Sequence, residues 1–230
     1  MASVVNVKEK FPGVFWIEFE DGTKILATKN LTPGFKVYDE KLIKYKGIEY
    51  RSWNPYRSKL AAAIIKGLKE FPIKEGQRIL YLGIASGTTA SHISDIIGKS
   101  GIIYGIEFAH RPLRDLLRVA RIRRNIIPLL KDARLPGMYD YIGECVDGIY
   151  CDVAQPDQAR ILADNAKMFL RPGGWFMIAI KARSIDVTRP PEEIYKEQAE
   201  FLKNEGLKVV EQINIEPYSR DHVMFIGYRE

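Results

Sequence analysis

The sequence predicts an α/β protein in which a doubly wound sheet follows a small, β-rich N-terminal subdomain. From about Pro55 onward, short apolar runs alternate with longer segments whose apolar residues recur at helical spacing. This alternation is typical of a doubly wound sheet with helices on both faces. Before Pro55, runs of β-branched and aromatic residues stand out instead. We therefore divide the chain into a β-rich subdomain at 1–54 and an α/β domain at 55–230.

The N-terminal subdomain carries one clear local signal, a β-hairpin. The runs 14–20 and 23–28 are rich in β-branched and aromatic residues, and Asp21-Gly22 lies between them. An Asp-Gly pair between two such runs favours a hairpin.

The α/β domain opens with a helix at about 56–70, in which Leu60, Ile64 and Leu68 recur at helical spacing. A short apolar strand at 78–82 follows. Because a strand comes next after a helix and the pattern then repeats, we expect one sheet to run through the whole domain.

The remaining elements continue this alternation. Pro156 suits the first turn of a helix, and the Pro-Gly-Gly sequence at 172–174 suits a turn before a strand. The expected elements are helices at 88–97, 112–123, from Pro156 onward and at 191–204, with strands at 102–106, 125–130, 146–151, 175–180, 208–215 and 222–228.

The composition is that of a globular protein. With 230 residues, 46% of them hydrophobic, the chain can bury a substantial core, which excludes a disordered chain, a collagen and a disulfide-rich miniprotein. No apolar run approaches the roughly 20 residues of a membrane span, and the start lacks the apolar core of a signal peptide. We expect a soluble intracellular protein. A net charge of +6 favours polyanionic partners without requiring them.

Cysteine and histidine are too sparse to suggest a metal site. Cys145 and Cys151 form neither a CxxC pair nor a zinc spacing, and the three histidines lie far apart in the sequence. We expect no metal, and two buried free thiols in a reducing cytosol.

The residues that follow each strand are the candidates for function, because ligands of such sheets bind beyond the carboxyl ends of the strands. After the strand at 78–82, Gly83 and Gly87 allow a sharp turn and a close approach of the backbone to a ligand. Thr88 and Thr89 add hydroxyl groups at the start of a helix. The spacing is not GxGxxG, and such a turn alone is also compatible with a purely structural role.

Acidic residues follow the next strands. Glu107 can accept hydrogen bonds from the two hydroxyls of a ribose, although a solvated glutamate at a strand end is the alternative. Asp132 can hold the amine of an adenine, or it can simply form a turn. Asp152 and Lys181 end two further strands and are expected to face the same crevice, although a lysine there can also extend into solvent. Together these residues favour an adenosine-containing cofactor.

Five segments carry a resemblance to a known family. They are 53–60 (WNPYRSKL), 81–92 (YLGIASGTTASH), 105–111 (GIEFAHR), 152–156 (DVAQP) and 181–186 (KARSID). Jointly they resemble the fibrillarin family over essentially the whole chain. The Gly/Arg-rich N-terminal extension of the eukaryotic relatives is absent here, which makes the chain similar to the archaeal form.

The resemblance implies a Rossmann-like, S-adenosylmethionine-dependent methyltransferase sheet and an RNA 2′-O-methyltransferase that acts in rRNA and tRNA processing. Its target sites would be chosen by a box C/D guide RNA. The implied partners are that guide RNA, the target rRNA or tRNA, a Nop-family scaffold protein and a kink-turn-binding protein of ribosomal type, with no membrane. The implied location is the cytoplasm of an archaeal cell, and we expect little or no activity from the isolated chain.

The resemblance also implies the site residues. The cofactor would be bound at the ends of the strands by Gly83, Ala85, Thr88, Thr89, Glu107, Phe108, Asp132, Ala133, Asp152, Val153, Ala154 and Gln155. The implied catalytic set is Lys59, Asp152, Lys181 and His222.

The chemistry suggests a role for each catalytic residue. Methyl transfer to a hydroxyl is an in-line displacement, so the enzyme mainly positions two groups, and the ribose hydroxyl must lose its proton. Our hypothesis is that Lys181, in its neutral form, is the general base and that Asp152 orients it near the positive methyl donor. Lys59 and His222 would hold the target ribose and its phosphate.

Two other functions fit parts of the sequence. An NAD-dependent oxidoreductase would explain Glu107, but GxGxxG and a second substrate domain are missing. A non-catalytic subunit of an RNA–protein particle could keep the fold without turnover.

A basic stripe on one expected helix remains. Its arginines recur at steps of three and four residues, so it suits either contact with RNA phosphates or a solvated face that meets acidic proteins. The stripe comprises Arg111, Arg114, Arg118 and Arg121, extended by Arg123 and Arg124.

Overall fold

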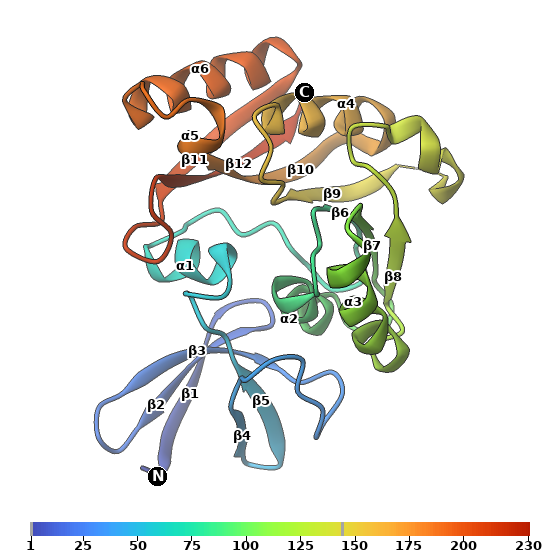
Figure 1. Cartoon of the computed structure of the whole chain (residues 1–230). Helices are drawn as coiled ribbons and strands as arrows, with labels where there is room; N and C mark the ends of the chain where they lie inside the picture. Colours follow the sequence, from blue (N-terminus) through green and yellow to red (C-terminus); the bar gives the residue numbers. More distant parts are fainter. Residues whose placement is uncertain (1, 144) are drawn as a thin grey trace.

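The chain forms two β-sheets with helices packed around the larger one (Figure 1). The computed structural model describes residues 2–143 and 145–230. The five-stranded sheet lies in the N-terminal part, with the order β1-β2-β3-β5-β4, and the seven-stranded sheet has the order β11-β12-β10-β9-β6-β7-β8. The α/β architecture predicted from the sequence is confirmed, while the division into domains at 1–54 and 55–230 stays a prediction.

The N-terminal sheet is antiparallel throughout. The expected hairpin is present, but β2 ends at Phe19 and β3 begins at Lys24, so its connection runs over 20–23 and is longer than the Asp-Gly pair alone. Asp21 accepts a hydrogen bond from the Thr23 backbone N–H at 2.9 Å and so stabilises this loop. The strands are β1 (Val4–Phe11), β2 (Val14–Phe19), β3 (Lys24–Lys29), β4 (Leu42–Tyr45) and β5 (Ile48–Ser52).

The large sheet is parallel from β8 to β10, and β12 is antiparallel to both of its neighbours. The direction in which strands are added reverses between β6 and β9, which is where ligands bind in such sheets. Its strands are β6 (Arg78–Leu82), β7 (Ile102–Glu107), β8 (Ile126–Leu130), β9 (Val146–Cys151), β10 (Leu170–Lys181), β11 (Leu207–Asn214) and β12 (His222–Arg229).

Helices cover both faces of this sheet (Figure 1). Side chains alternate along β6, so Ile79 and Tyr81 pack toward α1, α2 and α3, whereas Leu80 and Leu82 pack toward α4 and α6. The N-terminal sheet adds Leu26 and its neighbours to the first of these cores. The helices are α1 (Lys59–Ile65), α2 (Thr88–Ile97), α3 (His110–Ile122), the 3₁₀ helix η1 (Pro136–Ile142), α4 (Gln158–Phe169), α5 (Ala182–Ile185) and α6 (Pro191–Asn204).

Several element boundaries differ from the prediction. The helix expected at 56–70 is only α1, because Ser58 caps its start by accepting a hydrogen bond from the Ala61 N–H and Gly67 leaves the helical region with a φ of 100°. Pro156 does not open a helix, since α4 begins at Gln158. The strand expected at 175–180 begins earlier, at Leu170.

The environments of Cys145 and Arg123 were predicted wrongly from the sequence. Cys145 is exposed rather than buried; Cys151 is buried, and this burial raises the pKa of its thiol to about 12. Arg123 does not extend the exposed basic stripe, because it lies beyond the end of α3 with its side chain fully buried against Asp95 of α2. Arg124, next in the chain, is exposed.

A buried charge network joins the N-terminal sheet to the main domain. One carboxylate oxygen of Asp95, on α2, accepts from Arg123 at 2.6 Å, and the other accepts from Arg51 of β5 at 2.8 Å. The Thr28 hydroxyl also donates to Asp95, at 2.7 Å. Arg51 pairs in addition with Glu40 at 2.7 Å, and all four charged side chains are fully buried. Such a network holds only if every charge keeps its partner.

Within the described residues, no helix is both long enough and apolar enough to cross a membrane. In the same part of the chain, no group of three or more His, Cys, Asp or Glu side chains could hold a metal ion.

Candidate active site and cofactor crevice

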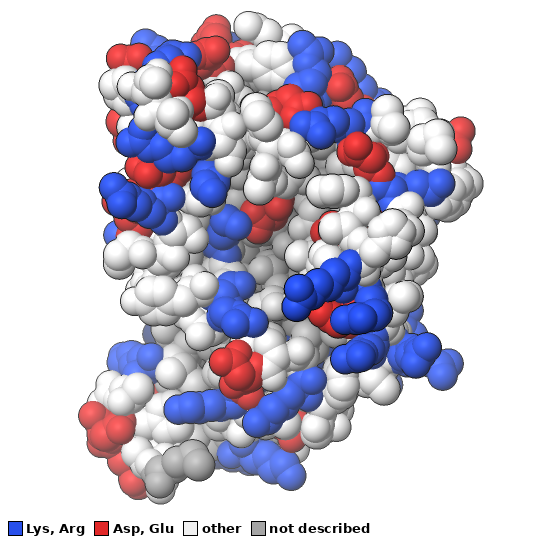
Figure 2. Space-filling view, viewed as in Figure 1, with Lys and Arg blue, Asp and Glu red and all other residues white. Residues whose placement is uncertain are grey.

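A cavity of about 280 Å³ lies at the carboxyl ends of β6, β7, β8 and β9, where the strand order reverses. Every residue that the resemblance implies for the cofactor lines it, except Thr88 and Thr89. Figure 2 shows the face of the molecule that is hollowed near its middle, with acidic atoms in the hollow and basic side chains on either side. The additional lining residues are Ile106, Lys131, Arg134 and Ile161.

The turn after β6 has a backbone conformation that lets it pass very close to neighbouring atoms. Gly83 has a φ of 76°, and a Cβ added there would lie 2.7 Å from the backbone oxygen of Asp152. Ala85 has a φ of 52°, which is an unusual conformation for a residue with a side chain. Strained backbone of this kind is concentrated at ligand sites, and here it bends the chain around the cavity.

Glu107 supports this turn from the end of β7. Its carboxylate, in a residue only 7% exposed, accepts hydrogen bonds from the Ala85 N–H at 3.0 Å and the Ala109 N–H at 2.8 Å. Each carboxylate oxygen keeps a further acceptor position for a ligand hydroxyl. Glu107 therefore positions the turn and lines the cavity at once.

An arginine connects two of the loops around the cavity. Arg134 donates to Asp157 at 2.8 Å from both Nε and Nη2, and to the Gln155 side chain at 2.9 Å. Its backbone N–H donates to Asp132 at 2.9 Å, which shapes the loop after β8. The loop after β8 and the loop after β9 are thus tied together at the edge of the cavity. The sequence analysis missed Arg134 because its partners lie more than twenty positions away.

The two threonines do not line the cavity; they are the first two residues of α2. Thr89 is buried and its hydroxyl donates to the Ser58 hydroxyl at 2.9 Å. Ser58 is the residue that caps α1, so Thr89 connects the start of α2 to the start of α1. Because Lys59 is the first residue of α1, this contact helps to position Lys59.

The cavity suits an adenosine-containing cofactor. A side chain at Gly83 would fill the space beside Asp152, and the acidic pair Glu107 and Asp132 offers acceptors for hydroxyl and amine donors. Phe108 adds an aromatic ring that is 62% exposed at the edge of the cavity. An aromatic ring, hydrogen-bond acceptors and a backbone without a side chain at Gly83 together suit the binding of a nucleoside.

The four predicted catalytic residues come from four elements that meet beside this cavity. Lys181 ends β10 and His222 begins β12, and the two are direct partners in the antiparallel ladder. Asp152 follows β9, the other neighbour of β10, and its backbone N–H donates to Leu82 of β6 at 2.9 Å. Lys59 reaches this point from α1.

Lys59 and Asp152 form an ion pair at 2.7 Å, with both side chains about three-quarters shielded from solvent. This differs from the expected orientation of Lys181 by Asp152. The Lys181 side chain makes no ion pair with any residue that the structure describes. Its backbone is held instead by the buried Gln158 side chain, which accepts from the Lys181 N–H at 3.0 Å and donates to its C=O at 3.3 Å.

The surroundings of His222 favour its neutral imidazole form. Burial lowers its pKa below the usual 6.5, and the nearby Lys59 and Lys181 cations lower it further, while the Arg220 carbonyl and Asp152 oppose them. The Nδ1 atom lies 2.6 Å from the Arg220 carbonyl, which requires Nδ1 to carry the hydrogen. The Nε2 atom is then a hydrogen-bond acceptor.

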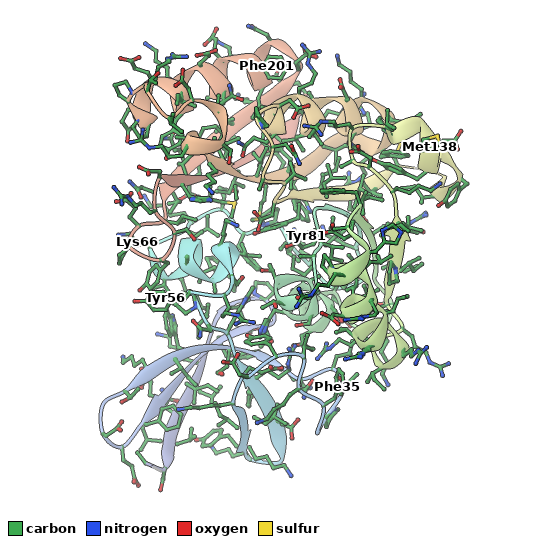
Figure 3. The ribbon with its side chains drawn as sticks, viewed as in Figure 1. Phe35, Tyr56, Lys66, Tyr81, Met138 and Phe201 are labelled. Atoms are coloured by element: carbon green, nitrogen blue, oxygen red, sulfur yellow. The ribbon has the colours of Figure 1, made fainter. Side chains whose placement is uncertain are left out.

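Two tyrosines lie beneath the Asp152 carboxylate, and the sequence analysis missed their role there. The rings of Tyr81 and Tyr150 are 4.7 Å apart, and both are buried (Figure 3 labels Tyr81). Burial raises the pKa of both hydroxyls well above the usual value of 10.0, and the negative charge of Asp152 raises them further. Both hydroxyls therefore stay neutral. The positions of Tyr81 and Tyr150 in two apolar strands, β6 and β9, were the only available signal.

The family to which the chain belongs follows from its similarity to known proteins. The profile of the fibrillarin family matches residues 5–230, which is nearly the whole chain. The chain belongs to the fibrillarin family. The fibrillarin-like rRNA/tRNA 2′-O-methyltransferase of Aeropyrum pernix is 58% identical over 226 residues, which cover 97% of each chain.

Two solved fibrillarin structures resemble the whole molecule. Aeropyrum pernix fibrillarin with natively bound S-adenosyl-L-methionine matches with a TM-score of 0.92 and 57% identity, covering 99% of this chain and 100% of that one. The fibrillarin of a fibrillarin/Nop5p complex matches with a TM-score of 0.86 and 43% identity, covering 97% and 100%. The fold of this fibrillarin-family chain is thus the Rossmann-like methyltransferase sheet that the resemblance implied.

Proposed function

We propose that this chain transfers a methyl group from S-adenosylmethionine to the ribose 2′-hydroxyl of rRNA and tRNA at sites chosen by a box C/D guide RNA. One observation carries the proposal: a nucleoside-sized cavity opens beside four convergent side chains, Lys59, Asp152, Lys181 and His222. The names of the relatives, which are rRNA/tRNA 2′-O-methyltransferases, and the relative with bound S-adenosyl-L-methionine support the same reaction.

The cofactor would lie along the ends of the strands. Glu107 would accept from the ribose hydroxyls, Asp132 from the adenine amine, and the turn at Gly83 would pass close to the cofactor. When bound, S-adenosylmethionine supplies an electrophilic methyl group on a positively charged sulfur. The carboxylate of Asp152, at the border between this cavity and the lysines, favours positive charge nearby.

The remaining residues prepare the ribose hydroxyl. Lys181 accepts the proton of the 2′-hydroxyl at Nζ when it is in its neutral form, and Gln158 fixes the backbone that carries it. His222 holds the same ribose through Nε2 as an acceptor, since its lowered pKa leaves it without charge for a phosphate. Lys59, held in place by its ion pair with Asp152, contacts the RNA phosphate.

The choice of target nucleotide would come from partners. A Nop-family protein is one partner, as in the fibrillarin/Nop5p complex. The guide RNA, the target RNA and a kink-turn-binding protein of ribosomal type complete the proposed particle, which would act in the cytoplasm of an archaeal cell. The chain's own positive charge of +6 attracts RNA of any sequence and therefore does not select a target.

The test is methyl transfer from labelled S-adenosylmethionine, measured with the reconstituted particle and with the chain alone. We expect label only in the complete particle, at the nucleotide paired with the guide, in a linkage that resists alkali. A complete particle that binds the cofactor and incorporates no label would instead identify a non-catalytic subunit.

A further inference from the structure

Asp221 lies directly before His222, at the end of the loop that joins β11 to β12 (Figure 1 draws this loop in red, near α1). Its backbone φ is 54°, in the left-handed region that residues with a side chain rarely adopt. Ala85, in the turn beside the cofactor cavity, shares this property. Such conformations persist only where their surroundings hold them, and they are concentrated at functional sites. Asp221 is therefore a candidate for a role at His222.

Three hydrogen bonds hold Asp221 in this conformation. Its backbone N–H donates to the Glu216 carboxylate at 3.0 Å, and its C=O accepts from the Ala182 N–H at 3.1 Å. Its carboxylate, with the side chain only 17% exposed, accepts from Nε of Arg183 at 3.3 Å. Arg220 is 3.6 Å from the same carboxylate, but its side chain is 90% exposed, so this ion pair adds little. The N–H, the C=O and the carboxylate of Asp221 each have a partner, and these partners fix its backbone.

These contacts link the ends of the two strands that carry Lys181 and His222. The two residues are direct partners in the ladder between β10 and β12. Ala182 and Arg183 follow Lys181 in α5, and Asp221 precedes His222. The contacts between Asp221 and α5 therefore extend the ladder beyond this pair and hold Lys181 and His222 side by side.

The Asp221 turn also determines where the proton of the His222 ring lies. Asp221 is the single residue between Arg220 and His222, and its left-handed turn brings the Arg220 carbonyl to 2.6 Å from Nδ1 of the imidazole. Because a carbonyl only accepts, Nδ1 must carry the hydrogen, and Nε2 is left as an acceptor. Within the described residues Nε2 makes no hydrogen bond of its own. With a negative φ at Asp221, the Arg220 carbonyl would leave Nδ1, and either nitrogen could carry the hydrogen.

We propose that Asp221 is a positioning residue, whose left-handed turn holds the Arg220 carbonyl on Nδ1 of His222 and so fixes the tautomer of the imidazole. Asp221 does not line the cofactor cavity, so it acts only through its neighbours. The consequence for methyl transfer rests on the proposed function, in which Nε2 of His222 contacts the target ribose. The tautomer itself does not depend on the reaction.

The test is nitrogen NMR of the full-length chain labelled with ¹⁵N in its three histidines, at a pH where His222 is uncharged. His222→Gln assigns the signals. We expect the unmodified chain to show a protonated Nδ1 and an unprotonated Nε2 at His222. Asp221→Val should give a mixture of tautomers, because a β-branched residue disfavours a positive φ. Asp221→Asn should restore the single tautomer, since asparagine tolerates this conformation and its amide oxygen can accept from Arg183.

The same variants are then compared in the reconstituted particle. Asp221→Val should lower the single-turnover rate of methyl transfer about tenfold, the effect of losing one hydrogen bond. Its affinity for S-adenosylmethionine should stay within about twofold, and Asp221→Asn should recover the rate. The matched control is Lys46→Val, because Lys46 has a φ of 46° but is exposed in the turn between β4 and β5. It carries the same backbone penalty and should keep both the tautomer and the rate.

An unchanged tautomer in Asp221→Val would overturn the inference, as would a changed tautomer with an unchanged rate. Equal changes in Lys46→Val would also overturn it, because the effect would then come from general destabilisation. If Asp221→Val does not fold, Asp221→Ala imposes a smaller backbone penalty and is read in the same way. If the unmodified particle transfers no methyl group, the proposed function fails, while the NMR comparison still decides whether Asp221 fixes the tautomer.

Discussion

The Lys59 ammonium group lies 2.7 Å from the Asp152 carboxylate, and this pair joins α1 to the end of β9 beside the cofactor cavity. The two residues are 93 positions apart in the chain. Each charge is therefore held in place by the other, and the site presents one paired lysine and one lysine, Lys181, whose backbone alone is fixed.

We expect this pair to act as a unit in methyl transfer. Lys59→Ala and Asp152→Asn should each reduce the rate, and the double variant should lose less than the two losses combined, with a coupling of about 1–2 kcal/mol. The measurement is single-turnover methyl transfer in the reconstituted particle for all four members of the cycle. Fully additive losses would show that the two residues work independently.

Lys181→Ala should abolish proton removal from the ribose hydroxyl. We expect the rate to fall by about 10²–10⁴-fold, while the affinity for S-adenosylmethionine changes only a few-fold, because Lys181 is not among the residues that line the cofactor cavity. Rates come from labelled methyl transfer, and affinities from calorimetry. Lys203→Ala, at the far end of α6, is the control. Near-normal turnover by Lys181→Ala would remove this residue from the role of base.

Gly83→Ala should prevent cofactor binding. The added Cβ would lie 2.7 Å from the Asp152 backbone oxygen, in a backbone with a φ of 76°. Gly34→Ala is the matched control, because Gly34 has a φ of 83° but no atom within 4 Å of an added Cβ. Gly34→Ala should lose about 1 kcal/mol of stability from backbone strain, and Gly83→Ala should lose more because of the added close contact. Only Gly83→Ala should weaken S-adenosylmethionine binding more than tenfold. Equal affinities would show that the turn adapts.

Arg123→Ala should destabilise the fold by about 3–5 kcal/mol, since it leaves part of the buried Asp95 charge without a partner. Its neighbour Arg124 is exposed, and Arg124→Ala should change the free energy of unfolding by less than about 0.5 kcal/mol. Denaturant unfolding monitored by circular dichroism measures both. Similar values for the two variants would mean that water replaces Arg123 in the network.

The free energy of unfolding should fall as the pH drops below about 6.5, because of His92. Burial and then the cations Arg51 and Arg123 lower the pKa of His92 well below its usual 6.5. Below pH 6.5 the unfolded chain therefore binds more protons than the folded chain, and stability decreases toward acid by up to about 1.4 kcal/mol per pH unit. His222 contributes in the same direction.

His92→Gln should make this pH dependence shallower. The ring of His92 lies 2.7 Å from the Thr28 hydroxyl and 2.6 Å from the Tyr38 hydroxyl, and a glutamine removes the titrating group. The measurement is unfolding by denaturant at a series of pH values from 7.5 down to about 5. His110→Gln, at the exposed start of α3, should keep the slope of the unmodified chain. An unchanged slope in His92→Gln would assign the pH dependence to other groups.

Elements with strong local signals could be predicted to the residue. The bounds of β6, α2, β9 and α6 agree with those expected, because glycines or a proline mark the ends of several of them and their apolar periods are clear. The strand ends of a parallel sheet also bring their residues together by topology. That is why most of the expected cofactor residues line one cavity.

The partners of charged side chains could not be predicted in the same way. Arg123 continues a row of exposed arginines in the sequence, and only the fold reveals that Asp95 of α2 lies within 2.6 Å. From the sequence, Asp152 could pair with either Lys59 or Lys181, and the position of α1 places Lys59 next to it. Gln158 gives no signal at all, since its amide acts on the backbone of a residue 23 positions away. Contacts of this kind depend on tertiary structure and leave no local pattern.

The Asp95 carboxylate, which Arg51 and Arg123 share, has a consequence for how the N-terminal sheet is held against the main domain. Separating this sheet from α2 would expose three fully buried charges at once, so the sheet keeps its position. The two parts are then preorganised: the entropy of aligning them is lost when the chain folds, not when a partner arrives. A partner that contacts both parts gives up only its own freedom on binding.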